Sequence, residues 1–259
     1  MKKNYLSILE ENGILVIPNY FTKIQCNKII DQINHFKNKD KIVNQRDEGM
    51  GGDLRIFNFE DYSPDVLKFA NDSILKDLVS NYAKTPLETK SVLAGKVVFN
   101  KYNETNSGGD WHRDGDVSQM KAMVYLSEVN NQNGPFTFIK NSKNFDFKRR
   151  NNKYPFIQRL IFKLKGLPIK PPRYKHDEII NQPEMRENIF KVLGKAGTLV
   201  LFDGRYIHRG DVIKSGSRYS LTNYYYPLTK KDTFFYIKGF IKNIMSLNNP
   251  IINNKHEKK

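Results

Sequence analysis

The stretch Gly197-Thr-Leu-Val-Leu-Phe-Asp-Gly-Arg-Tyr-Ile-His-Arg-Gly-Asp211 indicates the fold most clearly. It predicts a buried strand, an Asp203-Gly204 turn and a second short strand that presents His208 at its end. Several short strands with turn residues between them are typical of a β-sandwich or barrel, and helical spacing elsewhere predicts helices packed outside it. The other predicted strands cover residues 13–18, 95–102, 120–127, 134–139, 206–212 and 218–226, and helices are predicted near residue 4, after Thr22 and over residues 66–78.

Composition places the chain among ordinary globular proteins. It has 259 residues, of which 39% are hydrophobic, and this is enough to form the core of one large domain. No apolar run approaches the ~20 residues that a membrane-spanning helix needs, and the single cysteine, Cys26, excludes a disulfide scaffold. The first residues do not develop the apolar stretch of a secretory signal. We therefore expect a single domain over residues 1–259, located in the cytoplasm.

The net charge of +16 is concentrated in one segment. Residues 140–175 hold twelve Lys and Arg side chains against one acidic side chain, together with four prolines and no alternation of apolar and polar residues. This pattern predicts a basic insertion, or lid, at residues 140–195 that lies over the sheet. Residues 246–259 are predicted to form a flexible tail.

Three interpretations of this basic segment stay open. Its residues 154–166 place apolar side chains along one helical stripe, as in a helix at a membrane interface or a helix that simply covers a sheet. The charge could form the solvated rim of a lid, or a site for an anionic or lipid-linked substrate at an anionic membrane surface, or a contact with nucleic acid. No recognition motif accompanies the charge, so specific recognition of nucleic acid is not expected.

The motif His112-Arg113-Asp114 carries the first candidate metal ligands. An extended chain directs its imidazole and its carboxylate to one side, where both can bind one ion. This spacing is common by chance, but His208 supplies a second imidazole far along the chain. The strand that begins at Arg218 carries Arg218, Ser220 and Thr222 on one face, and such side chains pack poorly in a core but suit a bound carboxylate.

Two histidines and one carboxylate form the facial triad that suits Fe(II) and leaves three coordination positions open. A 2-oxo acid can occupy two of these positions through its ketone and its C1 carboxylate, and O2 can occupy the third. The far carboxylate of the 2-oxo acid then requires a cation with a hydroxyl group beside it, which Arg218 and Ser220 can supply.

Four segments resemble the phytanoyl-CoA dioxygenase-like branch of the Fe(II)/2-oxoglutarate-dependent oxygenases. They are Glu10-Glu-Asn-Gly-Ile-Leu-Val-Ile-Pro18, Trp111-His-Arg-Asp-Gly115, Tyr125-Leu-Ser-Glu-Val-Asn-Asn-Gln-Asn-Gly-Pro-Phe136 and His208-Arg-Gly-Asp-Val-Ile-Lys-Ser-Gly-Ser-Arg-Tyr-Ser220. The resemblance implies a mainly β fold with flanking helices, the double-stranded β-helix (jelly roll, cupin-like). It also implies a dioxygenase in which His112, Asp114 and His208 hold iron, Arg218 anchors 2-oxoglutarate, O2 is the second cosubstrate and ascorbate is an assisting reductant.

Asp114 bears on the expected reaction, because related halogenases carry a small residue in place of this carboxylate. We therefore expect hydroxylation of a C–H bond in a small or lipid-linked metabolite, which could be anionic, coupled to conversion of 2-oxoglutarate to succinate and CO2. Further candidates are Thr137 and Asn100 beside the cosubstrate, and Arg55, Tyr102 and Trp111 beside the substrate.

Two other functions stay open. A catalytically silent β-helix protein could bind an acidic ligand or a membrane surface through the basic segment. A cupin-like isomerase or epimerase could use the same metal ligands with another metal, although such a reaction does not need Arg218 and Ser220 as a clamp for 2-oxoglutarate.

Overall fold

The computed structural model describes residues 2–37, 45–47, 53–99, 110–114, 119–145 and 173–227. Residues 1–226 form one compact unit and residues 227–259 a second one. Three of the predictions above fall outside the described residues. These are most of the basic segment, with its membrane and nucleic-acid interpretations, the tail at residues 246–259, and the candidate site residues Asn100 and Tyr102.

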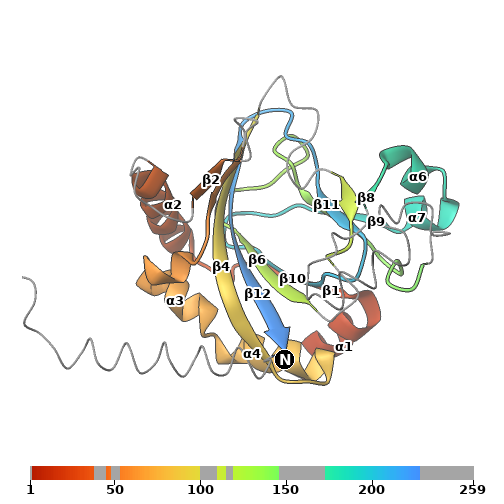
Figure 1. Cartoon of the computed structure of the whole chain (residues 1–259), viewed down its shortest axis with the longest axis horizontal. Coiled ribbons are helices and arrows are strands. Elements are labelled where there is room, and N and C mark those ends of the chain that lie inside the picture. Colours follow the sequence, from red (N-terminus) through yellow and green to blue (C-terminus); the bar gives the residue numbers. More distant parts are fainter. Residues whose placement is uncertain are drawn as a thin grey trace, which may run out of the picture. The chain divides into compact units, whose positions relative to one another are not determined.

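Seven strands form the larger of two antiparallel sheets, in the order β1-β10-β6-β12-β4-β3-β2 (Figure 1). Five short strands form the smaller sheet, in the order β8-β5-β11-β7-β9. The strands of the larger sheet are β1 Ile14–Ile17, β10 Leu199–Asp203, β6 Met120–Tyr125, β12 Ser217–Pro227, β4 Leu87–Val98, β3 Asp53–Ile56 and β2 Gln45–Asp47. Those of the smaller sheet are β8 Arg173–Tyr174, β5 Trp111–His112, β11 His208–Gly210, β7 Phe136–Ile139 and β9 Ile189–Val192.

The two sheets pack against each other through apolar side chains. Because successive side chains of a strand point to opposite faces, every second residue of the central strands enters the space between the sheets. One buried cluster joins side chains of both sheets: Met123, Tyr125, Val200 and Phe202 from the larger, and Phe136, Phe138 and Val192 from the smaller. Two antiparallel sheets packed in this way form a jelly roll, so the predicted double-stranded β-helix with flanking helices is confirmed.

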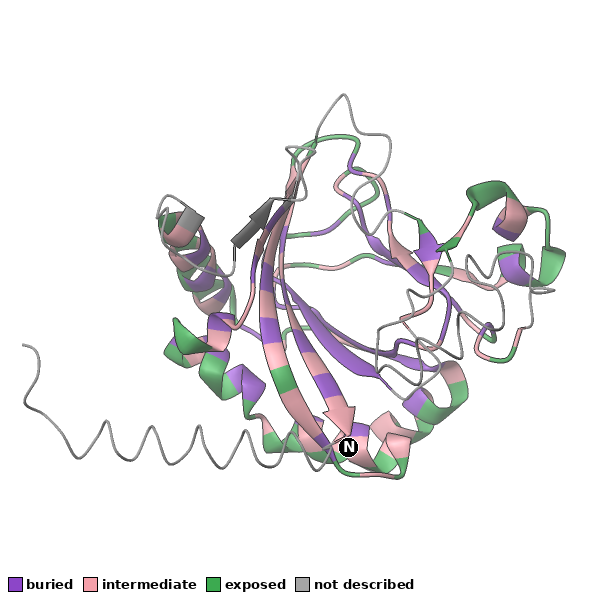
Figure 2. Cartoon of the chain, in the orientation of Figure 1, coloured by how far each residue is buried: buried purple, intermediate pink, exposed green. Residues whose placement is uncertain are grey.

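Helices cover the opposite face of the larger sheet, and Figure 2 shows their buried sides turned toward it. They are α1 Lys2–Asn12, α2 Lys23–Lys37, α3 Pro64–Ala70 and α4 Ser73–Ala83, with the short 3-10 helix η1 Phe59–Asp61. Their apolar side chains form a second cluster with the sheet, which includes Ile29, Ile33, Val66, Phe69, Leu75, Val79, Val92, Ala94, Leu221 and Tyr225. Two short helices, α6 His176–Ile180 and α7 Pro183–Glu187, pack against the smaller sheet through Ile179 and Met185.

Side-chain hydrogen bonds fix two of the helix starts. The Thr22 hydroxyl accepts a bond from the Gln25 amide (3.2 Å) and the Gln25 side chain accepts one from the Thr22 amide (2.9 Å), which is a capping box at the predicted start of α2. The helix predicted over residues 66–78 is two helices, because Asp72 caps a new start. Its carboxylate accepts bonds from the amides of Ile74 (2.9 Å) and Leu75 (3.0 Å).

The strand predicted from residue 95 begins earlier, at Leu87. Its first half carries the polar run Glu88 to Ser91 and lacks the apolar alternation on which the prediction depends. Within the described ranges, no helix is both long and apolar enough to cross a membrane.

Candidate active site

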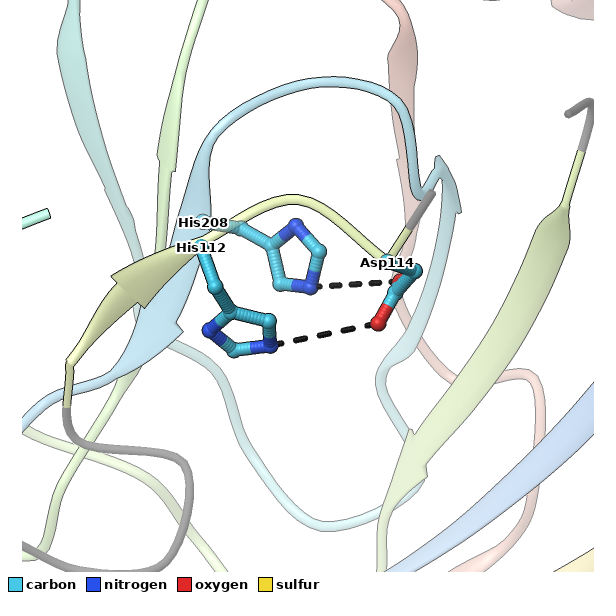
Figure 3. A group of neighbouring side chains, drawn as sticks. All are labelled: His112, Asp114 and His208. Carbon is cyan, nitrogen blue, oxygen red and sulfur yellow. Dashed lines mark ion pairs between the residues drawn. The ribbon is translucent and has the colours of Figure 1, made fainter. Parts of the chain in front are cut away.

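Three side chains from different elements converge between the two sheets (Figure 3). His112 of β5 and His208 of β11 are cross-strand neighbours, and their ring centroids lie 4.5 Å apart. Asp114 follows β5 and reaches both rings. Its Oδ1 lies 3.9 Å from Nε2 of His112 and its Oδ2 lies 3.4 Å from Nε2 of His208. The predicted convergence of these three residues is therefore present in the fold.

Backbone carbonyls orient both imidazoles. Nδ1 of His112 lies 2.8 Å from the carbonyl oxygen of Asp110, and Nδ1 of His208 lies 2.9 Å from that of Tyr206. Because a carbonyl can only accept, each Nδ1 must carry the proton, and each Nε2 presents its lone pair toward Asp114. Histidine ligands of metal ions commonly make this outer hydrogen bond.

Gly204 makes room for the carboxylate. The Asp114 amide donates to the Gly204 carbonyl (2.8 Å), and the Gly204 amide donates to the Gln119 carbonyl at the edge of β6 (2.8 Å). A Cβ atom at position 204 would lie less than 3.0 Å from Oδ2 of Asp114, a separation that real Cβ atoms essentially never show. A side chain at position 204 would therefore displace the Asp114 carboxylate from its observed place.

The electrostatics favour the protonation states that bind a divalent cation. Burial lowers the pKa of His208 to about 3. Burial, together with the charges of Lys121 and Arg173, also lowers the pKa of His112. Burial alone would raise the pKa of Asp114, but Lys121 and the two imidazoles bring it below its ordinary value. At neutral pH the site therefore holds two neutral imidazoles and one carboxylate.

These three residues fit an iron ion. Two ligand atoms bound at right angles to one metal at about 2.1 Å lie about 3 Å apart, and the candidate ligand atoms of the three residues all lie within 4.8 Å of one another. Oδ2 of Asp114 is buried and accepts no hydrogen bond from the part of the chain that the structure describes. Two imidazole nitrogens and one carboxylate oxygen on one side of an ion are the donor set of non-haem Fe(II) sites.

A lysine that the sequence interpretation missed lies directly beside this group. Lys121 of β6 is only 8% exposed, and its Nζ lies 2.7 Å from Oδ1 of Asp114. The signal was present in the sequence, because Lys121 is the single charged residue in the run from Met120 to Tyr125, which is buried throughout. A lysine in such a buried strand requires an anionic partner, because burial of an unpaired charge is costly.

The face of β12 predicted to bind a carboxylate points between the sheets. Burial alternates along this strand: Tyr219, Leu221, Asn223 and Tyr225 are buried, whereas Arg218, Ser220, Thr222 and Tyr224 are partly exposed on the other face. The Arg218 guanidinium donates to the Gly134 carbonyl. Arg55 is the cross-strand neighbour of Gly95, whose open side faces the Ser220 hydroxyl, so Arg55 lies on this inner face too.

Trp111 and Thr137 lie on the other face of the smaller sheet. Trp111 precedes His112 in the strand and packs with Ile139 and Ile207 beneath α6 and α7. Thr137 lies directly opposite Arg209, between the inward-facing Phe136 and Phe138. Because side chains alternate, neither of these residues shares the face of His112 and His208. This placement favours packing roles over the predicted contacts with substrate and cosubstrate.

Arg173 is a second residue that the sequence interpretation did not single out. It was counted only among the basic residues of the 140–175 segment, but in β8 it is the direct cross-strand neighbour of His112. The next residue, Tyr174, packs with the outer cluster around Trp111. The exposed Arg173 side chain therefore shares the inner face with the candidate metal ligand.

Comparison with known proteins identifies a family for the chain. The model of the phytanoyl-CoA dioxygenase family matches residues 9–219. No curated protein sequence matches the chain.

Several solved structures share the fold. They include the epimerase SnoN in complex with Fe3+, alpha ketoglutarate and nogalamycin RO (TM-score 0.64, 13% identity, 87% of this chain and 83% of that chain). HygX from Streptomyces hygroscopicus with nickel, 2-oxoglutarate and hygromycin B is similar too (TM-score 0.57, 18% identity, 88% of each chain). So is EctD from S. alaskensis with bound Fe (TM-score 0.59, 16% identity, 86% of this chain and 76% of that chain).

Proposed function

The chain belongs to the phytanoyl-CoA dioxygenase family of Fe(II)/2-oxoglutarate-dependent oxygenases, and on this premise we propose that it hydroxylates a C–H bond of a small or lipid-linked anionic metabolite. The observation that carries the proposal is the convergence of His112, Asp114 and His208, whose candidate ligand atoms all lie within 4.8 Å of one another. Asp114 supports hydroxylation because it completes the triad with a carboxylate, which leaves no ligand position for a halide.

The residues that bind the metal and those that bind 2-oxoglutarate have separate roles. Nε2 of both histidines and Oδ2 of Asp114 would hold the iron, which would supply the oxidising chemistry together with 2-oxoglutarate and O2. Arg218, with the Ser220 hydroxyl beside it, binds the far carboxylate of 2-oxoglutarate and thereby sets the orientation of its 2-oxo acid end.

Apolar side chains around the triad exclude water from the reacting centre. The rings of Phe202 and Phe136 lie 5.1 Å and 5.6 Å from the His208 ring. Both belong to the buried cluster between the sheets, so they are held in place by packing on both sides. Because this side of the site is apolar and closely packed, it keeps stray reductants away from the metal position. Oxidation is thereby directed to the substrate.

The position of Arg173 supports the proposal that the substrate is anionic. Its exposed side chain extends from the edge of the smaller sheet on the same face as His112, and its positive charge acts on the His112 ring. A guanidinium placed there can pair with a carboxylate or phosphate of the substrate and hold a neighbouring carbon near the metal.

The test measures succinate formation from 2-oxoglutarate with Fe(II), ascorbate, and pairs of candidate metabolites with and without a carboxylate or phosphate. Turnover should depend on the anionic member of a pair and disappear in His112→Ala and Asp114→Ala. Arg173→Glu should raise KM for that substrate by about tenfold or more, whereas Arg186→Glu, on exposed α7, should leave KM unchanged. Full turnover in either triad variant contradicts the metal assignment.

A second outcome deserves a product analysis, because SnoN is an epimerase and was crystallised with alpha ketoglutarate. A clamp for 2-oxoglutarate therefore does not by itself exclude epimerisation, contrary to the expectation from sequence. Hydroxylation adds the mass of one oxygen atom to the substrate, and that atom derives from O2. Epimerisation leaves the mass unchanged. A product of unchanged mass would contradict hydroxylation and favour epimerisation.

A further inference from the structure

The two oxygens of the Asp114 carboxylate have different surroundings. Oδ1 lies 2.7 Å from Nζ of Lys121 and 3.9 Å from Nε2 of His112. Oδ2 lies 3.4 Å from Nε2 of His208, above the glycine at position 204, and accepts no hydrogen bond from any residue that the structure describes. One oxygen therefore has a strong cationic donor, and the other is left for a ligand.

The fold holds the Lys121 ammonium at this position. Tyr224, its cross-strand neighbour in β12, places its ring centroid 5.0 Å from Nζ, and the Phe202 ring lies at 5.9 Å. The faces of aromatic rings attract a cation and exclude water from it. A buried ammonium without an anion is costly, so Asp114 and Lys121 stabilise each other inside the barrel.

Lys121 is separate from the proposed clamp for 2-oxoglutarate. It pairs with Tyr224, which is six residues beyond Arg218 on β12, so about 20 Å of strand separate the two positions. The partner of Lys121 is the metal ligand itself. This placement excludes the simplest alternative role, that of a second anchor for the far carboxylate of the cosubstrate.

We propose that Lys121 is a positioning residue that occupies Oδ1 of Asp114 and so restricts this carboxylate to binding the metal through Oδ2 alone. The inference rests on the proposed function, because it assumes a metal at the triad. A carboxylate can bind a metal through one oxygen or through both. Two histidines and one carboxylate oxygen leave three of six positions free, two for 2-oxoglutarate and one for O2, and a second carboxylate oxygen would take the last of these.

The test uses nitric oxide as a stand-in for O2 and has a readout separate from turnover. Fe(II) and then 2-oxoglutarate are added anaerobically to the full chain, and formation of the complex is followed by its visible charge-transfer band. Nitric oxide is then titrated and its binding followed by electron paramagnetic resonance. Lys121→Met, which is close in size but has no charge, should still form the band but bind nitric oxide about tenfold more weakly or worse.

Two further variants complete the design. Lys121→Arg keeps a cation with donors in reach of Oδ1 and should bind nitric oxide almost as the wild type does. Lys96→Met is the matched control, because Lys96 also lies over a ring, that of Tyr219 (4.7 Å), in the larger sheet. It should change nothing.

The outcomes separate the two proposals. If Lys121→Met forms the complex and binds nitric oxide as tightly as the wild type, the positioning role is overturned while the oxygenase assignment stands. The same holds if folded Lys121→Arg binds nitric oxide as weakly as Lys121→Met. Failure of the wild type to form the band at all would instead overturn the proposed function. Thermal denaturation of each variant establishes that it is folded.

Discussion

Replacing Gly204 with alanine should displace one metal ligand while leaving the rest of the site in place. The added Cβ would lie less than 3.0 Å from Oδ2 of Asp114, and 3.1 Å from both the Cβ of Asp114 and the carbonyl oxygen of Gln119. Relief of this overlap requires the carboxylate to move by about 1 Å, whereas metal–ligand distances tolerate about 0.2 Å. Gly204→Ala should therefore weaken metal binding by at least about tenfold, or about 1.4 kcal/mol.

Calorimetric titration of the metal-free protein with Mn(II) or Co(II) measures this effect. Gly95→Ala is the matched control, because a Cβ there would meet its nearest atom, Oγ of Ser220, at 3.6 Å, an ordinary van der Waals contact. It should bind the metal as the wild type does, and circular dichroism should show both variants folded. Wild-type affinity in folded Gly204→Ala would refute the role of Asp114 as a ligand held by this turn.

Three further predictions concern the stability of the fold. A metal at a hundred times its Kd should stabilise the folded protein by about 2.7 kcal/mol, and His112→Ala should remove most of this gain, as measured by thermal denaturation. Without metal, the free energy of unfolding should fall as pH drops below 6.5, because the unfolded His208 takes up a proton and the buried one, with its pKa of about 3, does not. His208 should contribute a slope of about 1.4 kcal/mol per pH unit, the value for one group, in addition to the contribution of His112, whose pKa is also lowered. Urea denaturation of His208→Gln should lack the His208 contribution. Trp111→Ala should cost about 3–5 kcal/mol of stability, and Trp111→Phe should leave KM for the substrate unchanged; a raised KM in Trp111→Phe would restore Trp111 to the substrate site.

Residue chemistry and strand periodicity predicted that His112, Asp114 and His208 would converge. The His112 and Asp114 spacing, the distant His208 and the alternating face of β12 each follow from a local pattern, and the antiparallel register brings β5 and β11 together. Local patterns say less about which face of a strand points inward, because a shift of one residue reverses every side chain. Trp111 was predicted from its place beside His112 and Thr137 from the family resemblance, and both lie on the outer face.

Residues whose role depends on the tertiary arrangement were harder to predict. The single lysine in the buried strand β6 indicated an anionic partner, but only the fold identifies that partner as Asp114, and only the strand register places Arg173 beside His112. Gly204 was interpreted as an ordinary turn glycine, but its function depends on the side chain that packs over it. The break between α3 and α4 is a local feature that an Asp72 cap could have indicated.

The most direct test of the central claim is the anaerobic absorption spectrum of the protein with Fe(II) before and after addition of 2-oxoglutarate. Chelation of 2-oxoglutarate by iron at the triad predicts a visible charge-transfer band that is absent in His208→Ala and needs a higher concentration of 2-oxoglutarate in Arg218→Ala. A folded wild-type protein that binds Fe(II) and shows no band on saturation with 2-oxoglutarate would contradict the account.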